Sequence, residues 1–207
     1  MSREGKINSK IVITGTLDLT EGVDKMAGET AWGQWQHQGL TFHLAATEQG
    51  LAYLGLPNES EAEFYRWIAL HLGITPSVGK HNEKMLTPYI DVLEQYMKGQ
   101  IRVFDVQLDL HGTPFQKSVW TWLTQIPYGY TRSYGDVARG IGRPTAARAV
   151  AQAVGHNPIA IIVPCHRVIG SDGGLVGYGG GLALKTHFLR LEGLTVENGR
   201  VNLCLDG

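Results

Sequence analysis

The spacing of apolar residues changes near His111 and Gly112, and this change constrains the fold more than any other feature. Between residues 40 and 110, stretches that alternate apolar and polar residues stand beside stretches of helical spacing, whereas residues 112–193 read as helices and loops. Alternation is typical of half-buried strands, and spacings of three and four residues are typical of amphipathic helices. We therefore expect a mixed α/β (α+β) fold. A small N-terminal sheet-plus-helix domain over 31–110 precedes a mainly helical domain over 111–207.

The N-terminal half contains both kinds of pattern. The alternation predicts strands over 40–44, 51–56 and 104–110, with a turn at 48–50. A capping-box spacing at Ser60 predicts a helix that ends at Gly73, and Thr87-Pro88 predicts the start of another that ends near Gly99. Residues 1–30 are polar and glycine-containing, apart from a β-like run at 11–14. We expect them to form a partly disordered leader.

Composition limits the cellular setting. The 207 residues carry a net charge of −1, and only two are cysteines. Two cysteines cannot build a disulfide framework, which favours a reducing, intracellular location. The sequence has no apolar span long enough for a bilayer, and its start lacks the apolar core of a secretory signal. We expect a cytoplasmic protein that makes no contact with membranes.

Charge is distributed unevenly along the chain. Residues 111–207 carry nine Lys and Arg against five Asp and Glu, and residues 132–167 hold five arginines with Asp136 as their only acid. A basic stripe on a nearly neutral protein can mark contact with phosphate groups. A solvated surface that happens to be basic explains the same pattern, and charge alone favours that simpler interpretation.

Two short helices after residue 130 have the layout of a helix-turn-helix. The sequence predicts a capped helix from Thr113, a second from Ser133 to about Arg139, and a third from Pro144 to about Gly155. Glycines at 140 and 142 separate the second from the third. Paired short helices joined by a glycine-containing turn are typical of the helix-turn-helix.

The faces of the predicted 144–155 helix differ sharply. Helical spacing places one apolar set together for packing, namely Ala146, Ala149, Val150, Ala153 and Val154. The opposite face holds Arg148, Ala151, Gln152 and Gly155, and it is almost without bulk. A smooth face with one arginine suits close approach to a nucleic-acid groove. A tightly packed alanine-rich core helix fits the pattern equally well.

The stretch PCHRVIG, from Pro164 to Gly170, places one cysteine between a proline and two basic residues. The nucleophile is the thiolate, and nearby cations lower a thiol pKa, so His166 and Arg167 are candidate activators. Adjacency in sequence does not establish pairing, and most free cysteines are structural. Cys165-His166 lacks the spacing of zinc ligands, so we expect neither a metal nor a cofactor. A glycine-rich loop, 171–182, follows and could bring backbone groups close to a flat ligand.

PCHRVIG resembles the active-site motif of the O6-alkylguanine-DNA alkyltransferases, or methylated-DNA–protein-cysteine methyltransferases. The resemblance covers about 112–193, through the blocks GTPFQKSVW, IPYGYTRSYGDVA, RPTAARAV, NPIAIIVPCHRVIG, GYGGGLALK and LEG. It implies single-turnover DNA repair, in which Cys165 irreversibly accepts an alkyl group from O6 of a flipped guanine. The implied partner is double-stranded DNA containing O6-alkylguanine, bound through its minor groove by a monomer.

The resemblance also implies roles for individual residues. His166 would activate Cys165 through a bridging water, Glu192 would orient His166, and Asn157 would brace the segment before the cysteine. Tyr134 would help rotate the nucleotide and donate a hydrogen bond to the base, and Arg148 would fill the gap that the base leaves. The remaining implied DNA contacts are Ala147, Ala151 and Gln152; the implied alkylguanine pocket is Pro164, Val168, Tyr178 and Gly179.

Some positions depart from the family pattern. Ala151 stands where many members have glycine, and Gly179 where some have serine, so only a backbone contact is implied at Gly179. The chain has no cysteine before residue 165, and it therefore lacks the ligands of the family's zinc-binding N-terminal domains.

Two other functions remain open at this stage. A non-catalytic module that binds alkylated DNA would share this domain, but such relatives lack the cysteine. A Cys-His hydrolase would use the same pair on an ester or amide, but the sequence shows no separate oxyanion device.

Overall fold

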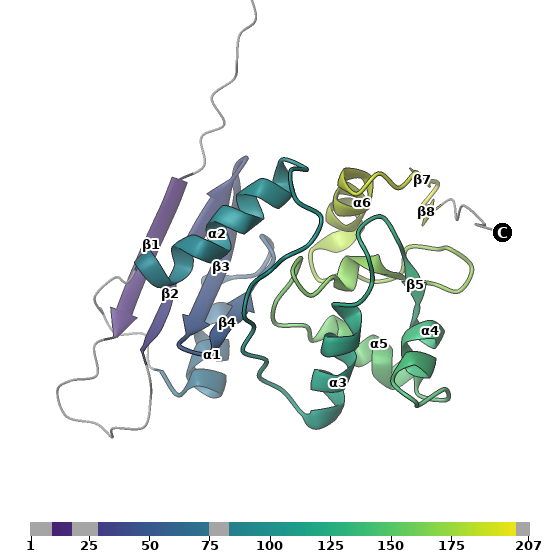
Figure 1. Ribbon diagram of the computed structural model, residues 1–207, viewed down its shortest axis with the longest axis horizontal. Helices are drawn as coiled ribbons and strands as arrows, with labels where there is room; N and C mark the ends of the chain where they lie inside the picture. The colour runs from purple at the N-terminus through teal and green to yellow at the C-terminus, as the bar shows by residue number, and fades with distance from the viewer. Residues whose placement is uncertain (1–9, 18–28, 75–82, 202–207) are drawn as a thin grey trace, which may run out of the picture. The chain divides into compact units, whose positions relative to one another are not determined.

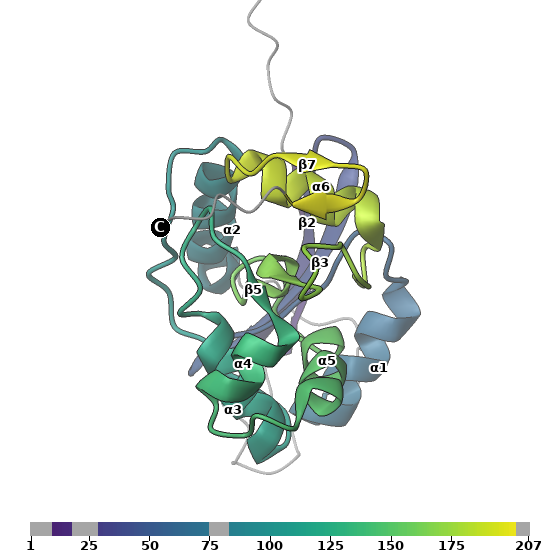
Figure 2. The same cartoon turned by 90° about the vertical axis from the view of Figure 1, so that its right-hand side faces the viewer.

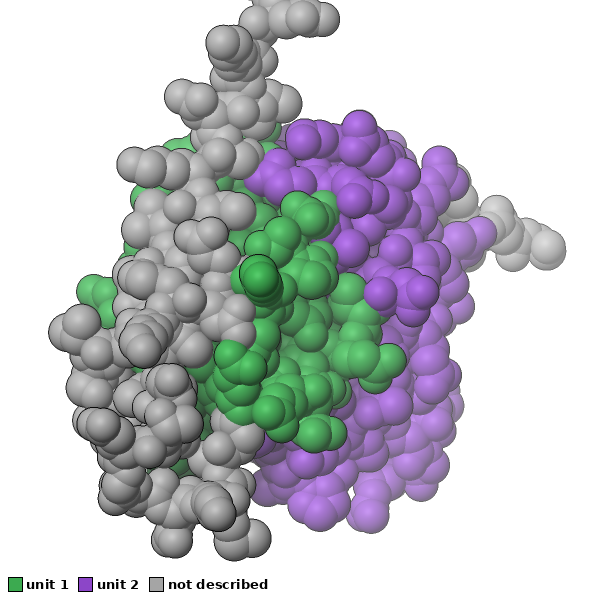
Figure 3. Space-filling model, turned by 60° about the vertical axis from the view of Figure 1, so that its left-hand side comes forward, with its two compact units in different colours: residues 1–91, 106–109 green, residues 92–105, 110–207 purple. Residues whose placement is uncertain are grey.

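A computed structural model describes residues 10–17, 29–74 and 83–201, and these form the mixed α/β fold that the sequence predicts. The chain divides into two compact units, which Figure 3 colours separately: residues 1–91 with 106–109, and residues 92–105 with 110–207. Residues 92–105 therefore belong to the second unit, although they lie before the predicted boundary at residue 110. That boundary remains a prediction about domains.

The first unit contains an antiparallel sheet in the order β1-β2-β3-β4 (Figure 1). Its strands are β1 (Lys10–Leu17), β2 (Thr30–His37), β3 (Leu40–Thr47) and β4 (Gly50–Leu54). The sequence predicted β3, β4 and the turn between them, and the run at 11–14 lies in β1. It missed β2, whose residues are almost all buried. The sequence of β2, TAWGQWQH, does not alternate apolar and polar residues, so periodicity does not indicate a strand there.

Two helices cover the sheet from opposite sides (Figures 1 and 2). On one side, α1 (Glu61–Leu72) stacks Phe64 against His43 of β3, with 4.9 Å between ring centroids. On the other, Tyr89 of α2 (Glu83–Met97) hydrogen-bonds the backbone of Leu51. Helix α1 has the predicted capping box at Ser60, and Gly73 ends it in the left-handed conformation.

Two predictions for this half were wrong in detail. Helix α2 starts at Glu83 rather than at Thr87-Pro88, so Pro88 lies inside it. This proline has no N–H to donate within the helix, and the helix continues past it to Met97. The predicted strand 104–110 keeps its alternation but forms only an isolated bridge, between Leu108 and Leu51. Of the predicted leader, 1–9 and 18–28 lie outside the described residues.

The second unit is built on three packed helices, α3 (Pro114–Leu123), α4 (Tyr134–Gly140) and α5 (Ala147–Gly155), grouped in Figure 2. The predicted capping boxes at Thr113 and Ser133 are both formed. Helix α5 starts at Ala147 and not at Pro144, which lies in the turn before it. The buried Trp120 of α3 donates its Nε1–H to the carbonyl of Ala153, 2.8 Å away, and fixes α3 against α5.

The remaining elements carry the predicted site. Short strands β5 (Arg132–Ser133) and β6 (Val168–Ile169) pair in parallel, and they align the start of α4 with the segment after the cysteine. The 3₁₀ helix η1 (Cys165–Arg167) contacts α6 (Gly181–Leu191). A hairpin of β7 (Val196–Glu197) and β8 (Arg200–Val201) packs Val196 and Val201 against Leu189 of α6.

Candidate active site

The backbone reaches Cys165 through two tight turns inside the protein. Residues 159–163 are all buried. The N–H of Ile162 donates to the carbonyl of Ala160 at 2.8 Å, and Ile161 between them has a φ of 70°. A β-branched residue at positive φ is strained, and such strain is found where the surroundings fix the backbone. A second turn around Pro164 joins the N–H of Cys165 to the carbonyl of Val163 at 2.8 Å.

Asn157 holds this double turn in place. Its Nδ2 donates to the carbonyls of Val163 and Ile159 at 2.8 and 3.3 Å, and its Oδ1 accepts from the N–H of Ile159 at 3.1 Å. These are backbone groups that the tight turns leave without partners in a sheet or helix. The Asn157 side chain therefore supplies hydrogen-bond partners to this segment, as a neighbouring strand would in a sheet.

Cys165 is buried, with 6% of its surface exposed. Burial raises the pKa of its thiol, while a hydrogen bond from Asn157 and the charge of Lys185 lower it to a smaller extent. Two tyrosines lie close enough to Cys165 for its charge to affect them. Burial raises the pKa of Tyr134 and the pKa of Tyr178, and the charge of Cys165 raises both further. The predicted acceptor thus lies near Tyr134, predicted as a catalytic and DNA-binding residue, and near Tyr178, predicted as a pocket residue.

His166 is fully buried, and its Nε2 lies 2.8 Å from Oε1 of Glu192. Burial raises the pKa of Glu192, but the hydrogen bonds and charges of His166 and Arg167 outweigh it and hold this pKa at about 2. The carboxylate is therefore ionised at neutral pH, and Nε2 must carry the proton. Burial lowers the pKa of His166. The ring is then neutral, and Nδ1, which bonds to none of the described residues, is its basic atom.

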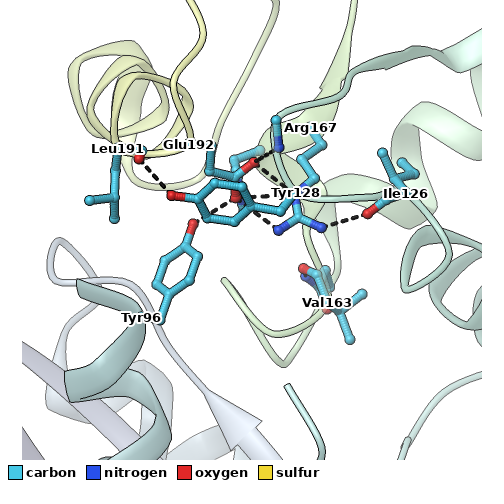
Figure 4. A network of polar contacts seen from close by, with 10 residues as sticks. Tyr96, Ile126, Tyr128, Val163, Arg167, Leu191 and Glu192 are labelled. Atoms are coloured by element: carbon cyan, nitrogen blue, oxygen red, sulfur yellow. Dashed lines mark hydrogen bonds and ion pairs between the residues drawn. The ribbon is translucent and has the colours of Figure 1, made fainter. Parts of the chain in front are cut away.

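Glu192 accepts hydrogen bonds from several directions (Figure 4). Arg167 approaches it with Nε, 3.0 Å from Oε2, and with Nη2, 2.8 Å from Oε1. The hydroxyl of Tyr96 donates to Oε1 at 2.7 Å, and the N–H of Gly129 donates to Oε2 at 3.1 Å. The other end of the Arg167 guanidinium donates to the carbonyl of Ile126. The Arg167 guanidinium therefore pairs with Glu192 rather than with Cys165, which stands two residues before it in the sequence.

Lys185 is a site residue that the sequence reasoning missed. Its side chain is fully buried in α6, and Nζ donates to the carbonyls of Val168 and Val176 at 2.6 and 3.0 Å. Burial lowers its pKa to about 8, against the opposing effect of Cys165. The available signal was its spacing, because Lys185 stands three and four residues before Phe188 and Leu189 and so lies on the buried face of α6.

The predicted pocket residues differ in burial, and Val168 among them bonds this lysine through its carbonyl. Pro164 and Val168 are buried, and Gly179 is exposed. Tyr178 is half-buried, and its hydroxyl is enclosed without a hydrogen bond of normal geometry to the described residues, although Cys165 is close enough to affect it. Tyr134 donates a long hydrogen bond of 3.4 Å to the carbonyl of Val176, so the glycine-rich loop contacts both Tyr134 and Lys185.

Helix α5 largely has the two faces that the sequence predicts. Val150, Ala153 and Val154 are buried, whereas Arg148, Gln152 and Gly155 are exposed and Ala147 and Ala151 are half-buried. Ala149 was assigned to the packed face and is exposed instead. The helix therefore combines a packed side with a nearly smooth side.

The described residues contain neither a cluster of metal ligands nor a membrane-spanning helix. Within residues 10–17, 29–74 and 83–201, no three His, Cys, Asp or Glu side chains come together as metal ligands would. None of the helices in these ranges has the length and apolar character needed to cross a bilayer.

Comparison with known proteins connects this geometry to one family. A family model described as "6-O-methylguanine DNA methyltransferase, DNA binding domain" matches residues 114–194. The inducible methylated-DNA–protein-cysteine methyltransferase of Bacillus subtilis is 40% identical over 161 residues, which cover 78% of this chain and 89% of that protein.

Solved structures agree with the sequence match. The crystal structure of Mycobacterium tuberculosis O6-methylguanine methyltransferase is 41% identical, has a TM-score of 0.66, and is aligned over 79% of this chain and 92% of its own. The same organism's protein in complex with DNA is 44% identical with a TM-score of 0.62, over 73% and 86%. The chain belongs to the methylated-DNA–protein-cysteine methyltransferase family.

Proposed function

We propose that this chain repairs DNA by moving an alkyl group irreversibly from O6 of guanine to Cys165, once per molecule. The observation that carries the proposal is the ionised Glu192 beside Nε2 of His166, which leaves Nδ1 as a free base one residue from a buried thiol. The membership in the family and the match to the B. subtilis enzyme over most of its length support the same reaction.

The proton and the electrons balance without a cofactor. A water molecule relays the thiol proton to Nδ1 of His166, since Nδ1 has no direct bond to the sulfur. The sulfur attacks the alkyl carbon, an S–C bond forms, and the C–O6 bond breaks with its electron pair on the guanine. Glu192 stabilises the imidazolium formed, and the guanine anion recovers the proton. The product is a thioether that no group in the site can cleave.

The thiol is buried, so its substrate must come to it. A guanine stacked in a duplex cannot reach the sulfur of a buried cysteine, so the nucleotide must flip out. The smooth face of α5, with Ala147, Ala151 and Gln152, is suited to the minor groove, and Arg148 is suited to fill the vacated space. The M. tuberculosis relative solved with DNA supports a DNA partner.

The pocket walls fit a flat purine. Tyr134 and Tyr178 lie near the sulfur, and the backbone of Val168 and Gly179 offers polar groups at its edges. In this proposal Tyr134 donates a hydrogen bond to the base during transfer, and Asn157 holds the sulfur in line by fixing the turn before it. The protein acts as a cytoplasmic monomer, since one unit supplies every site residue and the thiol needs reducing conditions.

The test is intact-protein mass spectrometry after incubation with duplex DNA that contains O6-methylguanine. The chain should gain the mass of one methylene, as methyl replaces the thiol hydrogen, and peptide mapping should place it on Cys165. Cys165→Ala should bind the same duplex and gain nothing. A wild-type chain that binds the lesion without gaining mass would instead be the non-catalytic module, and turnover of a simple ester would indicate a hydrolase.

A further inference from the structure

Tyr96 lies outside the family-model match at 114–194, yet its hydroxyl reaches the Glu192 carboxylate. It comes from the last turn of α2 and donates to Oε1 at 2.7 Å (Figure 4). The same oxygen accepts Nε2–H of His166 at 2.8 Å. Tyr96 is itself fully buried. The hydroxyl and the imidazole thus share one acceptor atom inside the protein.

The ring of Tyr96 is held firmly enough for its hydroxyl to have one position. Phe104, Tyr128 and Phe188 surround it, with ring centroids 5.0, 6.2 and 6.4 Å away. Phe188 also contacts the ring of His166, at 5.4 Å. A hydroxyl fixed in this way presents a constant dipole to the carboxylate.

We propose that Tyr96 is a positioning residue of the alkyl-transfer reaction, which sets the basicity of His166 through Glu192. The inference rests on the proposed function. The hydroxyl hydrogen draws electron density from Oε1 and places the positive end of its dipole toward the imidazole. Glu192 then favours the imidazolium less than a carboxylate without this donor would. His166 consequently stays neutral, and able to take the thiol proton, down to a lower pH.

Other charges act on the same pair, and the test must hold them constant. Arg167 in η1 and Lys185 in α6 both lower the pKa of His166, while Glu192 raises it. Burial, and then the charge of Glu192, raise the pKa of Tyr128 in the turn after α3. Arg102 and Arg167 face the ring of this tyrosine. Tyr96 differs from Tyr128 in that it donates to the carboxylate; Tyr128 donates to the carbonyl of Leu191, at 2.7 Å.

The experiment measures single-turnover alkylation by free O6-benzylguanine against pH, which avoids any effect on DNA binding. Tyr96→Phe should shift the acid limb upward by about half a pH unit, so that the rate well below that limb falls roughly threefold, while the plateau changes less than about twofold. Tyr128→Phe is the matched control, because it removes a hydroxyl from a ring that packs against Tyr96. The acid limb of its pH–rate profile should stay in place.

A second variant keeps the proposal testable if Tyr96→Phe is unstable. Site-specific 3-fluorotyrosine at position 96 makes the hydroxyl a stronger donor and should shift the acid limb to lower pH. An acid limb that stays in place in both variants, or moves opposite to these directions, overturns the role of Tyr96. A wild-type chain that is never alkylated overturns the proposed function instead, so the two failures are distinguishable.

Discussion

Nε2 of His166 and Oε1 of Glu192 lie 2.8 Å apart, and both side chains are fully buried. The two residues are 26 positions apart in sequence, and α6 lies between them. Since Arg167 also binds this carboxylate, Glu192 remains ionised and keeps the proton of His166 on Nε2. The hydrogen bond from Nε2 to Glu192 thereby leaves Nδ1, on the other side of the ring, as the nitrogen that can accept a proton.

Replacing Glu192 should impair the chemistry more than DNA binding. In Glu192→Gln the imidazolium loses its counter-charge, so the single-turnover rate with O6-benzylguanine should fall about 100-fold. Affinity of the Cys165→Ala background for lesion duplex should change little when the same substitution is added. A transfer rate within about twofold of wild type would remove Glu192 from the mechanism.

Acid should destabilise the fold through the same residue. The pKa of Glu192 is about 2 in the folded chain, below the value of about 4.3 for an unperturbed glutamate. A carboxyl whose pKa is lowered by folding stabilises the folded chain at pH values above its unfolded pKa. This contribution to the free energy of unfolding is lost as the pH falls toward 2. Urea unfolding between pH 5 and pH 2.5 should show a decline in the free energy of unfolding that is shallower in Glu192→Gln. Parallel declines in the two proteins would contradict this assignment.

Removing the buried cation should affect both stability and the thiol. Lys185→Met removes the ammonium donor to the carbonyls of Val168 and Val176, which should cost about 1–3 kcal/mol in unfolding free energy. It also removes a charge that lowers the pKa of Cys165, so iodoacetamide labelling should need a higher pH. Lys117→Met, at an exposed position of α3, is the control and should alter neither quantity.

Arg148 is expected to matter only when a base must leave a duplex. Arg148→Ala should slow methyl transfer from duplex O6-methylguanine by roughly tenfold or more, because the vacated stack is no longer filled. Its rate with free O6-benzylguanine should match wild type. Arg66→Ala, an exposed arginine of α1, serves as the control. Equal losses on both substrates would refute the proposed wedge role.

The turn before the cysteine should depend on Asn157. Asn157→Ala removes the amide hydrogen bonds to Val163 and Ile159, so the carbonyl of Val163 keeps only the N–H of Cys165. This should lower the unfolding free energy by about 1–3 kcal/mol. It also removes a group that lowers the thiol pKa, so the thiol should titrate at higher pH. Thiol titration by absorbance at 240 nm would measure this, and an unchanged curve would limit Asn157 to stabilising the fold.

The sequence by itself determined the features that depend on neighbours a few residues apart. The capping boxes at Ser60, Thr113 and Ser133, the alternation of β3 and the two-sided α5 all follow from such local signals. The PCHRVIG motif likewise indicated the family before any geometry was known. The strand β2 escaped detection because its sequence, TAWGQWQH, lacks the alternation of apolar and polar residues on which prediction depends.

Only the tertiary structure decided which partners the site residues have. Arg167 stands two residues from Cys165 in sequence, but its charge goes to Glu192, 25 positions away. Tyr96 reaches the same carboxylate across 96 positions, and Lys185 in α6 is the cation that lowers the thiol pKa. These contacts depend on how distant segments pack, and side-chain direction in a buried turn follows from that packing rather than from the order of residues.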